Sequence, residues 1–399
     1  MIFKLAPHHE RVRRMIREFI EREIIPLVPG DDELAYYNRS LLEKVGKVGI
    51  WGLCIPECYG GGGYDYISLA IACEEFEWVD SACRVTLSVH LALNSLAILQ
   101  WGTEDQKLQY LIPQTKGLRI GAFALSEPEA GSDIGNIKTV ARREGKGYVL
   151  NGVKMWVSLA DVADNFLVFA CTAPEAKNKG VTCFLVEREY PGVEAASTYG
   201  KMNMRLSNAG KLVLRDVYVP LENVVGEVGE GFKIALSAID HGRYTSAAGA
   251  IGLTRACLEA SVKHAQKRKS FGQELGRHQL VQDMIARMDL GLETSQLLVY
   301  KAGWMMNEGL RCTKEIAMAK WQACNVAFQS AADTIQILAG SGYDVSCPFE
   351  RYLRNAKSAE IYTGTREILE LMVAEYSLGY REDKTLRKSL PPWPFINKG

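Results

Sequence analysis

The chain has 399 residues, 47% of them apolar, and its 47 basic side chains balance 47 acidic ones to a formal net charge of zero. This length allows two or three packed domains with a sizeable core. The balanced charge argues against a general nucleic-acid-binding protein and a polybasic membrane-surface protein, although it leaves room for a local phosphate site.

The cysteines and the first residues favour a cytoplasmic protein. None of the ten cysteines falls in a CxxC pair, and no histidine cluster follows the closest two, Cys54 and Cys58. This pattern is typical of small buried side chains in a reducing compartment rather than of a disulfide framework. The segment Met1 to Leu5 soon meets charged residues, unlike a signal peptide. No apolar run approaches the roughly 20 residues that span a bilayer.

The first part of the chain has the periodicity of helices. Apolar residues at i, i+3 and i+4 spacing predict a helix that stops at Pro26 and Pro29-Gly30. Further helical stretches cover roughly 40–115, and the loop Gly60 to Gly63 favours a helix connection over a phosphate cradle because no Lys-Ser/Thr pair follows. We predict an N-terminal helical domain over residues 1–117. The residues of the first apolar stripe are Val12, Met15, Ile16, Phe19, Ile20 and Ile24.

Short β-type runs replace the helical periodicity near residue 118. Asn151-Gly152 lies between two such runs, 148–150 and 153–157, and suits a hairpin turn because both central residues need positive φ. Further strands are expected at 166–171, 181–186 and 212–219. We therefore predict a small antiparallel β domain over residues 118–227.

Long helical segments return after Phe232. They cover about 231–266, 276–307, 313–340 and 363–377, and four long helices with short connections predict a bundle. We place this C-terminal four-helix bundle at residues 228–382, followed by a proline-rich, non-helical tail at 383–399. The predicted fold class is therefore mainly α with a central β domain.

This order of elements excludes a Rossmann dinucleotide domain. Such a domain needs alternating β and α units, with the string GxGxxG directly after a strand. The nearest glycine cluster, residues 226–231, reads GEVGEG and has the wrong order. Any nucleotide must therefore be held by another scaffold.

Two strings in the β region carry groups that suit a flat or anionic ligand. Residues 121–133 read GAFALSEPEAGSD, in which Ser126 and Ser132 can donate hydrogen bonds and Gly131 permits close approach of the backbone. Residues 154–158 read KMWVS. Taken alone, the first string fits a plain loop equally well, and Trp156 fits a core position better than a ligand site.

Two strings in the helical region carry charges. Residues 240–243 read DHGR, so Asp240 and Arg243 share one helix face, where they can meet one ligand or form only an ion pair. Residues 268–279 read RKSFGQELGRHQ, and the planar fork of Arg268 suits a pyrophosphate.

Together these strings resemble the acyl-CoA dehydrogenase family, in particular its short-chain, butyryl-CoA branch, over roughly residues 5–380. The resemblance implies an FAD-dependent oxidoreductase acting on the CH–CH group of an acyl-CoA thioester. Ser126 stands where the family more often has Thr, and Ala339, in the string QILAG, stands where it more often has Gly. The resemblance further implies a dimer-of-dimers homotetramer, with electron-transferring flavoprotein as the electron acceptor.

The resemblance also assigns site residues. Trp156 is expected to pack against the flavin, and the Ser158 hydroxyl to bond near flavin N5. The segments around Arg268 and Gln336 are expected to reach FAD bound mainly to a neighbouring subunit. The implied FAD residues are Phe123, Leu125, Ser126, Gly131, Ser132, Trp156, Val157, Ser158, Arg268, Ser270, Phe271, Gln279, Gln336, Ile337, Ala339, Gly340, Thr365 and Glu367. The implied substrate residues are Ser132, Asp240, Arg243 and Gly364.

One catalytic group of the family is missing. Residues 360–368 read EIYTGTREI, with Thr363 where the family often has the Glu that removes the α-proton as hydride leaves. A branch of the family carries that Glu immediately before the Arg that matches Arg243, but here the residue is Gly242. The backbone N–H of residue 363, which in the family polarises the thioester carbonyl, survives the change.

Three interpretations follow. The enzyme oxidises a non-standard thioester, such as an alicyclic acyl-CoA, with another base; or it is a reductase-type member or one whose substrate needs no protein base; or it is a non-catalytic subunit that binds FAD and CoA. His90 and Glu360 match common family residues, so neither is singled out as the base. A helical binding module without flavin is the rival outside the family.

Overall fold

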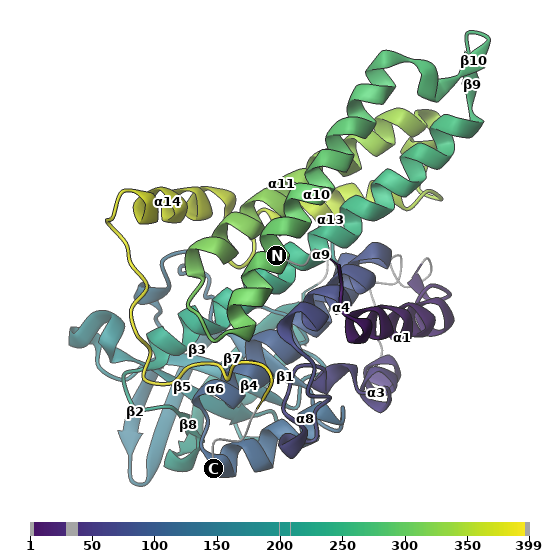
Figure 1. Cartoon of the computed structure of the whole chain (residues 1–399). Coiled ribbons are helices and arrows are strands. Elements are labelled where there is room, and N and C mark those ends of the chain that lie inside the picture. The colour runs from purple at the N-terminus through teal and green to yellow at the C-terminus, as the bar shows by residue number, and fades with distance from the viewer. Residues whose placement is uncertain (1–3, 29–38, 199, 208, 396–399) are drawn as a thin grey trace.

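The computed structural model describes residues 4–28, 39–198, 200–207 and 209–395, and it has three parts (Figure 1). A group of helices at the N-terminus packs beside a β domain, and long helices rise from both. This is the three-part, mainly α architecture that the sequence predicts. Pro29 and Gly30 of the predicted helix stop lie outside the described residues.

The N-terminal helices form because each has an apolar face to bury. Val12, Ile16 and Ile20 of the first helix are buried, as the apolar spacing predicts, and that helix packs on α4. α4 packs on α9 on its other side. The bounds are α1 (Pro7–Glu23), α3 (Arg39–Lys47), α4 (Tyr66–Val79), α5 (Ser81–Leu87), α6 (Leu96–Trp101), α7 (Glu104–Gln106) and α8 (Ile112–Thr115), with a π-helix, η3 (Ser88–Ser95), between α5 and α6.

The helical run through α5, η3 and α6 corrects one expectation. Ser81–Trp101 is long and apolar enough to cross a membrane by length and composition, although we expected no such run. Every residue of the run is buried inside the fold, where η3 packs against α9 and β1. Its apolar character is therefore explained by its place in the core.

The β domain is one mixed sheet rather than the antiparallel sheet that we predicted. Its order is β6-β7-β3-β2-β4-β5-β8, and β1 pairs parallel with β4. β2 also meets β4 in parallel, at Val140 and Cys171. The β1–β4 pair forms because β1 enters from the helical domain and reaches its partner after the β2–β3 hairpin, rather than through a tight turn. The bounds are β1 (Gly121–Ala124), β2 (Val140–Glu144), β3 (Gly147–Val157), β4 (Asn165–Cys171), β5 (Val181–Glu187), β6 (Val193–Ser197), β7 (Gly210–Pro220) and β8 (Val224–Val225).

The predicted hairpin at Asn151-Gly152 is wrong. β3 runs straight through this pair, and the register against β7 shifts between Leu150 and Gly152, as at a β-bulge. The real turn lies at Gly145-Lys146, between β2 and β3, where Gly145 has a φ of 54°. A two-residue turn with positive φ is thus present, a few residues before the Asn-Gly pair.

The C-terminal part holds three long helices and several short ones. α9 (Gly231–Lys267), α10 (Gln279–Asn307) and α11 (Thr313–Leu338) lie side by side (Figure 1). The short hairpin of β9 (Lys269–Ser270) and β10 (Gln273–Glu274) caps their far end. α12 (Gly340–Tyr343) and α14 (Arg366–Ser377) follow, and α13 (Phe349–Ala359) is a helix that the sequence analysis missed.

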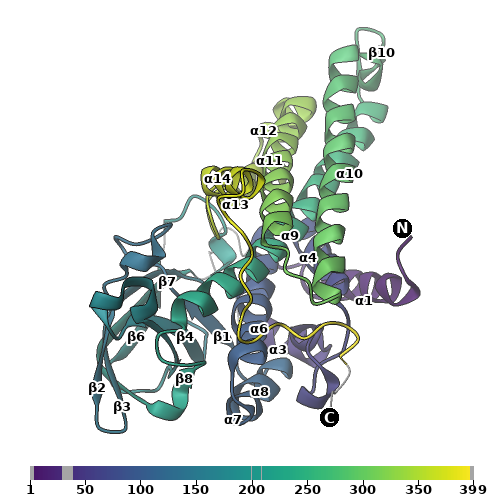
Figure 2. The same cartoon turned by 60° about the vertical axis from the view of Figure 1, so that its left-hand side comes forward.

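The tail returns across the N-terminal helices (Figure 2). The Tyr66 hydroxyl donates to the Pro391 carbonyl at 2.6 Å, and the Gln100 amide donates to the Lys388 carbonyl at 3.0 Å. The Trp393 indole donates to the Gly63 carbonyl at 2.9 Å. The tail is therefore non-helical, as predicted, and docked; residues 396–399 lie outside the described part.

Candidate active site

Three cationic contacts fix the loop that carries Thr363. The Lys320 ammonium donates to the carbonyls of Tyr362 and Gly364, both at 2.7 Å, and Arg243 Nε donates to the Thr363 carbonyl at 2.8 Å. Thr363 and Gly364 have φ values of 52° and 105°. In the described structure their N–H groups donate to no protein acceptor. The loop thus offers two unpaired peptide donors beside three occupied carbonyls.

The two positions where the family carries a base face the same space. A Cβ built on Gly242 would lie 3.3 Å from Thr363 Cγ2 and 2.8 Å from Leu93 Cδ2. The Thr363 hydroxyl donates to the Tyr362 carbonyl at 2.8 Å. This space is therefore lined by a methyl group, a leucine and a glycine, and neither of the two positions supplies a titratable side chain.

Asp240 and Arg243 meet on one face of α9, as predicted. Arg243 Nη1 lies 3.0 Å from Asp240 Oδ1, and the Thr313 hydroxyl donates to Asp240 Oδ2 at 3.0 Å. Both side chains are buried, and burial raises the pKa of the Asp240 carboxyl although Arg243 opposes the shift. Arg311, on the surface beside them, has Nη2 4.0 Å from Asp240 Oδ2.

Neither nearby histidine is placed as a base. His241 Nδ1 is buried without a hydrogen-bond partner, and burial lowers the pKa of His241 to about 4. With its pKa lowered in this way, the buried His241 ring is a weak base near neutral pH. His90 accepts from the Gly121 N–H at 3.0 Å and is hydrogen bonded to the Gln114 carbonyl at 3.2 Å, so both of its ring nitrogens are engaged.

A buried ion pair draws the two strings of the β domain together. The Lys154 ammonium on β3 lies 2.7 Å from Glu127 Oε1 and donates to the Leu125 carbonyl at 3.1 Å. The Met155 N–H donates to the Ser126 carbonyl at 2.8 Å. Burial lowers the pKa of Lys154 to about 8; burial also opposes ionisation of Glu127, but Lys154 outweighs this and keeps the pKa of Glu127 below its ordinary value.

The ends of these two strings carry the residues that the resemblance assigns to the flavin. Trp156 has a φ of 59° and is 62% exposed, unlike the core aromatic that its position suggested when taken alone. Ser158, two residues after Trp156, is half-buried, and so are Ser126 and Phe123 on the other string, whereas Leu125 and Val157 are buried. Gly131 and Ser132 are exposed. An exposed indole held in a sparsely populated backbone region is the kind of feature found where a ligand packs.

The other predicted FAD residues lie elsewhere in the chain. Arg268, Ser270 and Phe271 lie on or beside the β9–β10 hairpin, at the far end of the long helices from β3 (Figures 1 and 2), and Phe271 is 96% exposed. Gln279 begins α10, and Gln336, Ile337, Ala339 and Gly340 lie where α11 meets α12. The hairpin residues Arg268, Ser270 and Phe271 therefore do not meet Trp156 within one chain.

Among the predicted FAD residues, Ala339 and Thr365 have a local structural role. Ile337 is buried near the end of α11. Ala339 has a φ of 52°, a conformation that favours glycine, which is the commoner residue in the resembling family. Thr365 caps α14 by accepting from the Ile368 N–H at 3.4 Å, and Glu367 is exposed in the first turn.

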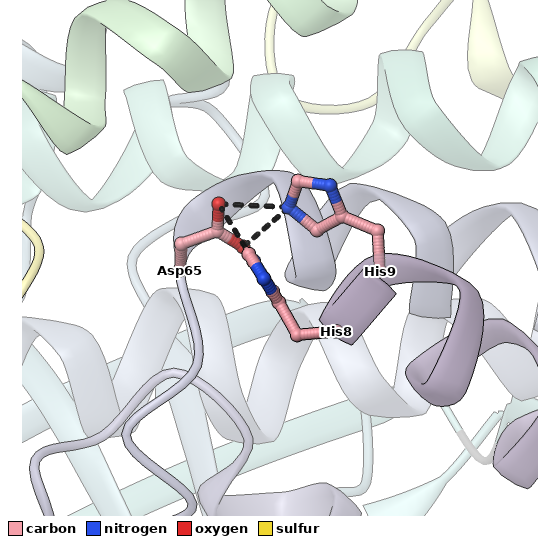
Figure 3. Close-up of side chains that lie close together, drawn as sticks. All are labelled: His8, His9 and Asp65. Atoms are coloured by element: carbon pink, nitrogen blue, oxygen red, sulfur yellow. Dashed lines mark hydrogen bonds and ion pairs between the residues drawn. The ribbon is translucent and has the colours of Figure 1, made fainter. Parts of the chain in front are cut away.

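A cluster at the N-terminus looks like a metal site but is not built as one. His8, His9 and Asp65 converge (Figure 3), and in the described part of the chain they form the group with metal-ligand spacing. His9 Nδ1 accepts from the Ala6 N–H at 3.1 Å, which leaves the proton on Nε2, 2.9 Å from Asp65 Oδ2. Because Nε2–H cannot bind a metal, the cluster acts as a helix anchor.

Sequence reasoning missed the residues that hold the site together. Lys320 is buried in α11, and Arg84 is buried in α5, where it contacts Glu77 at 2.5 Å and donates to the Tyr362 hydroxyl. Each is a lone charge within an apolar helical run, and such a charge predicts a buried polar contact. That signal was present in AMAKW and SACRVTL but was not used.

The chain thus combines a helical domain, a β domain and long helices with an exposed indole and two unpaired peptide donors. Three family models match the chain: the acyl-CoA dehydrogenase N-terminal domain at residues 6–117, the middle domain at 122–217 and the C-terminal domain at 229–378. The chain belongs to the acyl-CoA dehydrogenase family, whose members are FAD-dependent.

Individual relatives agree. The chain is 38% identical to the short-chain-specific acyl-CoA dehydrogenase of Clostridium acetobutylicum over 94% of this chain and 99% of the relative. It is similar to butyryl-CoA dehydrogenase from Megasphaera elsdenii, with a TM-score of 0.93, 35% identity and coverage of 95% and 100%. A chain in the solved structure of the electron transferring flavoprotein of Acidaminococcus fermentans gives a TM-score of 0.93, 38% identity and coverage of 95% and 100%.

Proposed function

We propose that this enzyme acts on a non-standard acyl-CoA thioester, for example an alicyclic one. Its proton is not removed by a side chain at position 363 or 242, the two places where the family carries its base. The observation that carries the proposal is the space shared by Thr363 and Gly242, because neither position supplies a carboxylate. The unpaired N–H groups of Thr363 and Gly364 remain beside it. The site thus keeps the means to polarise a carbonyl while lacking the base that straight-chain α,β-dehydrogenation requires.

The chain's own residues have separate roles in this proposal. The thioester carbonyl accepts from the Thr363 N–H, Asp240 and Arg243 contact the CoA part, and Ser132 and Gly364 also contact the substrate. Asp240 and Arg243 are already oriented by their mutual contact at 3.0 Å. Bound FAD supplies the hydride acceptor at N5. Trp156 and Ser158 hold the flavin ring, and the residues around Arg268 and Gln336 hold FAD of a neighbouring subunit.

Two alternatives make different predictions. A reductase-type member also needs no base at residue 363, because its proton is delivered to the substrate from another donor. A non-catalytic subunit keeps the binding surfaces without turnover. The buried, oriented Asp240–Arg243 pair favours a protein that still binds a thioester, and it is compatible with all three interpretations.

An anaerobic flavin-bleaching screen tests the proposal. FAD-loaded protein is mixed with straight-chain, branched, aromatic and alicyclic CoA esters, and the flavin absorbance is followed. We expect bleaching by a cyclic or branched ester and little or none by butyryl-CoA. Rapid bleaching by butyryl-CoA contradicts the proposal. Reoxidation of reduced flavin by an enoyl-CoA without forward bleaching supports the reductase, and co-purification with a Glu-bearing homologue supports the subunit.

The partners and the compartment are also proposals. An exposed apolar stripe on α10, made of Leu290, Leu297 and Trp304 at a spacing of seven residues, supports assembly into a homotetramer. The similarity to a chain in the electron transferring flavoprotein structure supports such a flavoprotein as the electron acceptor. We place the enzyme in the cytoplasm, in agreement with its similarity to a bacterial short-chain dehydrogenase.

A further inference from the structure

Lys320 is a buried ammonium that uses its hydrogen bonds on the backbone. It is fully buried in α11, and within the described residues no carboxylate forms an ion pair with it. Its two acceptors are the carbonyls of Tyr362 and Gly364, both at 2.7 Å, and its Nζ lies 5.6 Å from the centre of the Tyr362 ring. Burying a charge without a counter-ion costs free energy, so we expect the Lys320 ammonium to have a function that offsets this cost.

The peptide geometry indicates that role. The carbonyl of Tyr362 and the N–H of Thr363 belong to one planar trans peptide, so they point in opposite directions. When Lys320 holds that carbonyl, it fixes the direction of the Thr363 N–H. Arg243 does the same for the next peptide, because its bond to the Thr363 carbonyl at 2.8 Å fixes the Gly364 N–H. Two cations on two helices thus orient two successive donors.

We propose that Lys320 is a positioning residue that aims and strengthens the Thr363 N–H as donor to the thioester carbonyl. The inference rests on the proposed function, because it concerns the same carbonyl. Besides orientation, a positive charge at the oxygen end of a peptide polarises the whole group and makes its N–H a stronger donor. Lys320 therefore acts on the substrate without touching it, and it acts through the backbone whatever side chain residue 363 carries.

An alternative is that Lys320 only tethers α11 to the loop before α14. Both roles lead to loss of stability when the ammonium is removed, so stability and activity alone do not separate them. The carbonyl-stretching frequency of a bound thioester does separate them. It falls when the carbonyl accepts a strong hydrogen bond, and a tether that only supports the fold has no direct effect on it.

The test uses FAD-loaded enzyme and [1-13C]crotonyl-CoA, with isotope-edited infrared difference spectra of the bound thioester. The variant is Lys320→Met, which keeps the side-chain length and removes the donors. Lys357→Met is the matched control, because its ammonium lies 2.7 Å from Glu360 near the same loop but contacts neither carbonyl. FAD content and circular dichroism report folding, and Lys320→Arg asks whether a retained cation restores the shift.

We expect native enzyme and Lys357→Met to lower the carbonyl frequency equally, and Lys320→Met to lose most of that shift. On the substrate found in the bleaching screen, Lys320→Met should lower kcat roughly tenfold to a hundredfold with a small change in KM, somewhat less than removal of an oxyanion donor itself. A full shift in folded, FAD-loaded Lys320→Met overturns the positioning role. If that variant does not fold, the same criterion applies to Lys320→Gln. Absence of any shift in native enzyme that binds the thioester overturns both this inference and the proposed carbonyl contact.

Discussion

Replacing Thr363 with glutamate should return a base to the space that Thr363 shares with Gly242. The change is sterically feasible because the facing position is glycine: a Cβ there would lie 3.3 Å from Thr363 Cγ2, and without it the space is open on that side. The backbone also favours the change. Residue 363 has a φ of 52°, and a β-branched threonine is less suited to that conformation than an unbranched glutamate.

The expected gain in rate follows from the charges around residue 363 and from the rate enhancement that a general base contributes. Arg243 Nε lies 2.8 Å from the carbonyl of residue 363, and Lys320 holds both neighbouring carbonyls, so the new carboxylate has cations nearby that favour its ionised form. A positioned general base contributes about 10²- to 10⁴-fold in rate, or about 3 to 5 kcal/mol of barrier. We expect a gain in that range for α,β-dehydrogenation of butyryl-CoA.

The assay is anaerobic stopped-flow bleaching of the flavin by butyryl-CoA. Thr363→Gln is the matched control, since it has the same size and no basicity. Gly242→Glu addresses the same space from α9, but its Cβ would lie only 2.8 Å from Leu93 Cδ2, so we expect a smaller gain from it. Equal bleaching rates for Thr363→Glu and Thr363→Gln, with full FAD content and bound thioester in both, refute the reasoning.

Three further predictions follow. Glu127→Gln leaves the buried Lys154 charge without its partner at 2.7 Å, so we expect the free energy of unfolding in urea to fall by about 3 to 5 kcal/mol and FAD to be retained less well. A fall below about 1 kcal/mol contradicts a stabilising role for this ion pair. Burial lowers the pKa of His90 from 6.5 to about 4, so on acidification the unfolded chain takes up the proton before the folded one. The stability is therefore full above pH 6.5, and the free energy of unfolding should fall by about 3 kcal/mol towards pH 4. His90→Gln should show a weaker dependence on pH. Leu297→Lys places a charge in the α10 stripe and should shift the assembly to smaller species in analytical ultracentrifugation, whereas an unchanged sedimentation coefficient removes that stripe from the interface.

The sequence predicted the fold where periodicity or a local string decides it. The stripe of α1 and the long helices α9, α10 and α11 follow from the spacing of apolar residues, and the structure confirms them. The hairpin was misplaced because Asn151-Gly152 is also compatible with a bulge in a continuous strand, and the choice depends on pairing with β7. The parallel pairing of β1 with β4 joins residues more than forty positions apart, which no local pattern records.

The site was predictable in its parts but not in its arrangement. The DHGR string places Asp240 and Arg243 on one face, and the structure joins them at 3.0 Å. Sequence alone does not show that Gly242 faces Thr363 across the site, since the two residues lie on different elements far apart in the chain. Nor does it show that Lys320 reaches the loop around Thr363: a lone lysine in the apolar run AMAKW predicts a buried polar contact, but it does not identify the acceptor.

The arrangement explains how the loop can change its side chain and keep its donor. The Thr363 N–H is aimed by the contact of Lys320 with the preceding carbonyl, and the next donor is aimed by Arg243. Neither contact involves the side chain of residue 363. A substitution there therefore removes or adds proton-transfer chemistry while the carbonyl-polarising geometry stays in place. The same separation is why Thr363→Glu tests the base alone, and Lys320→Met tests the donor alone.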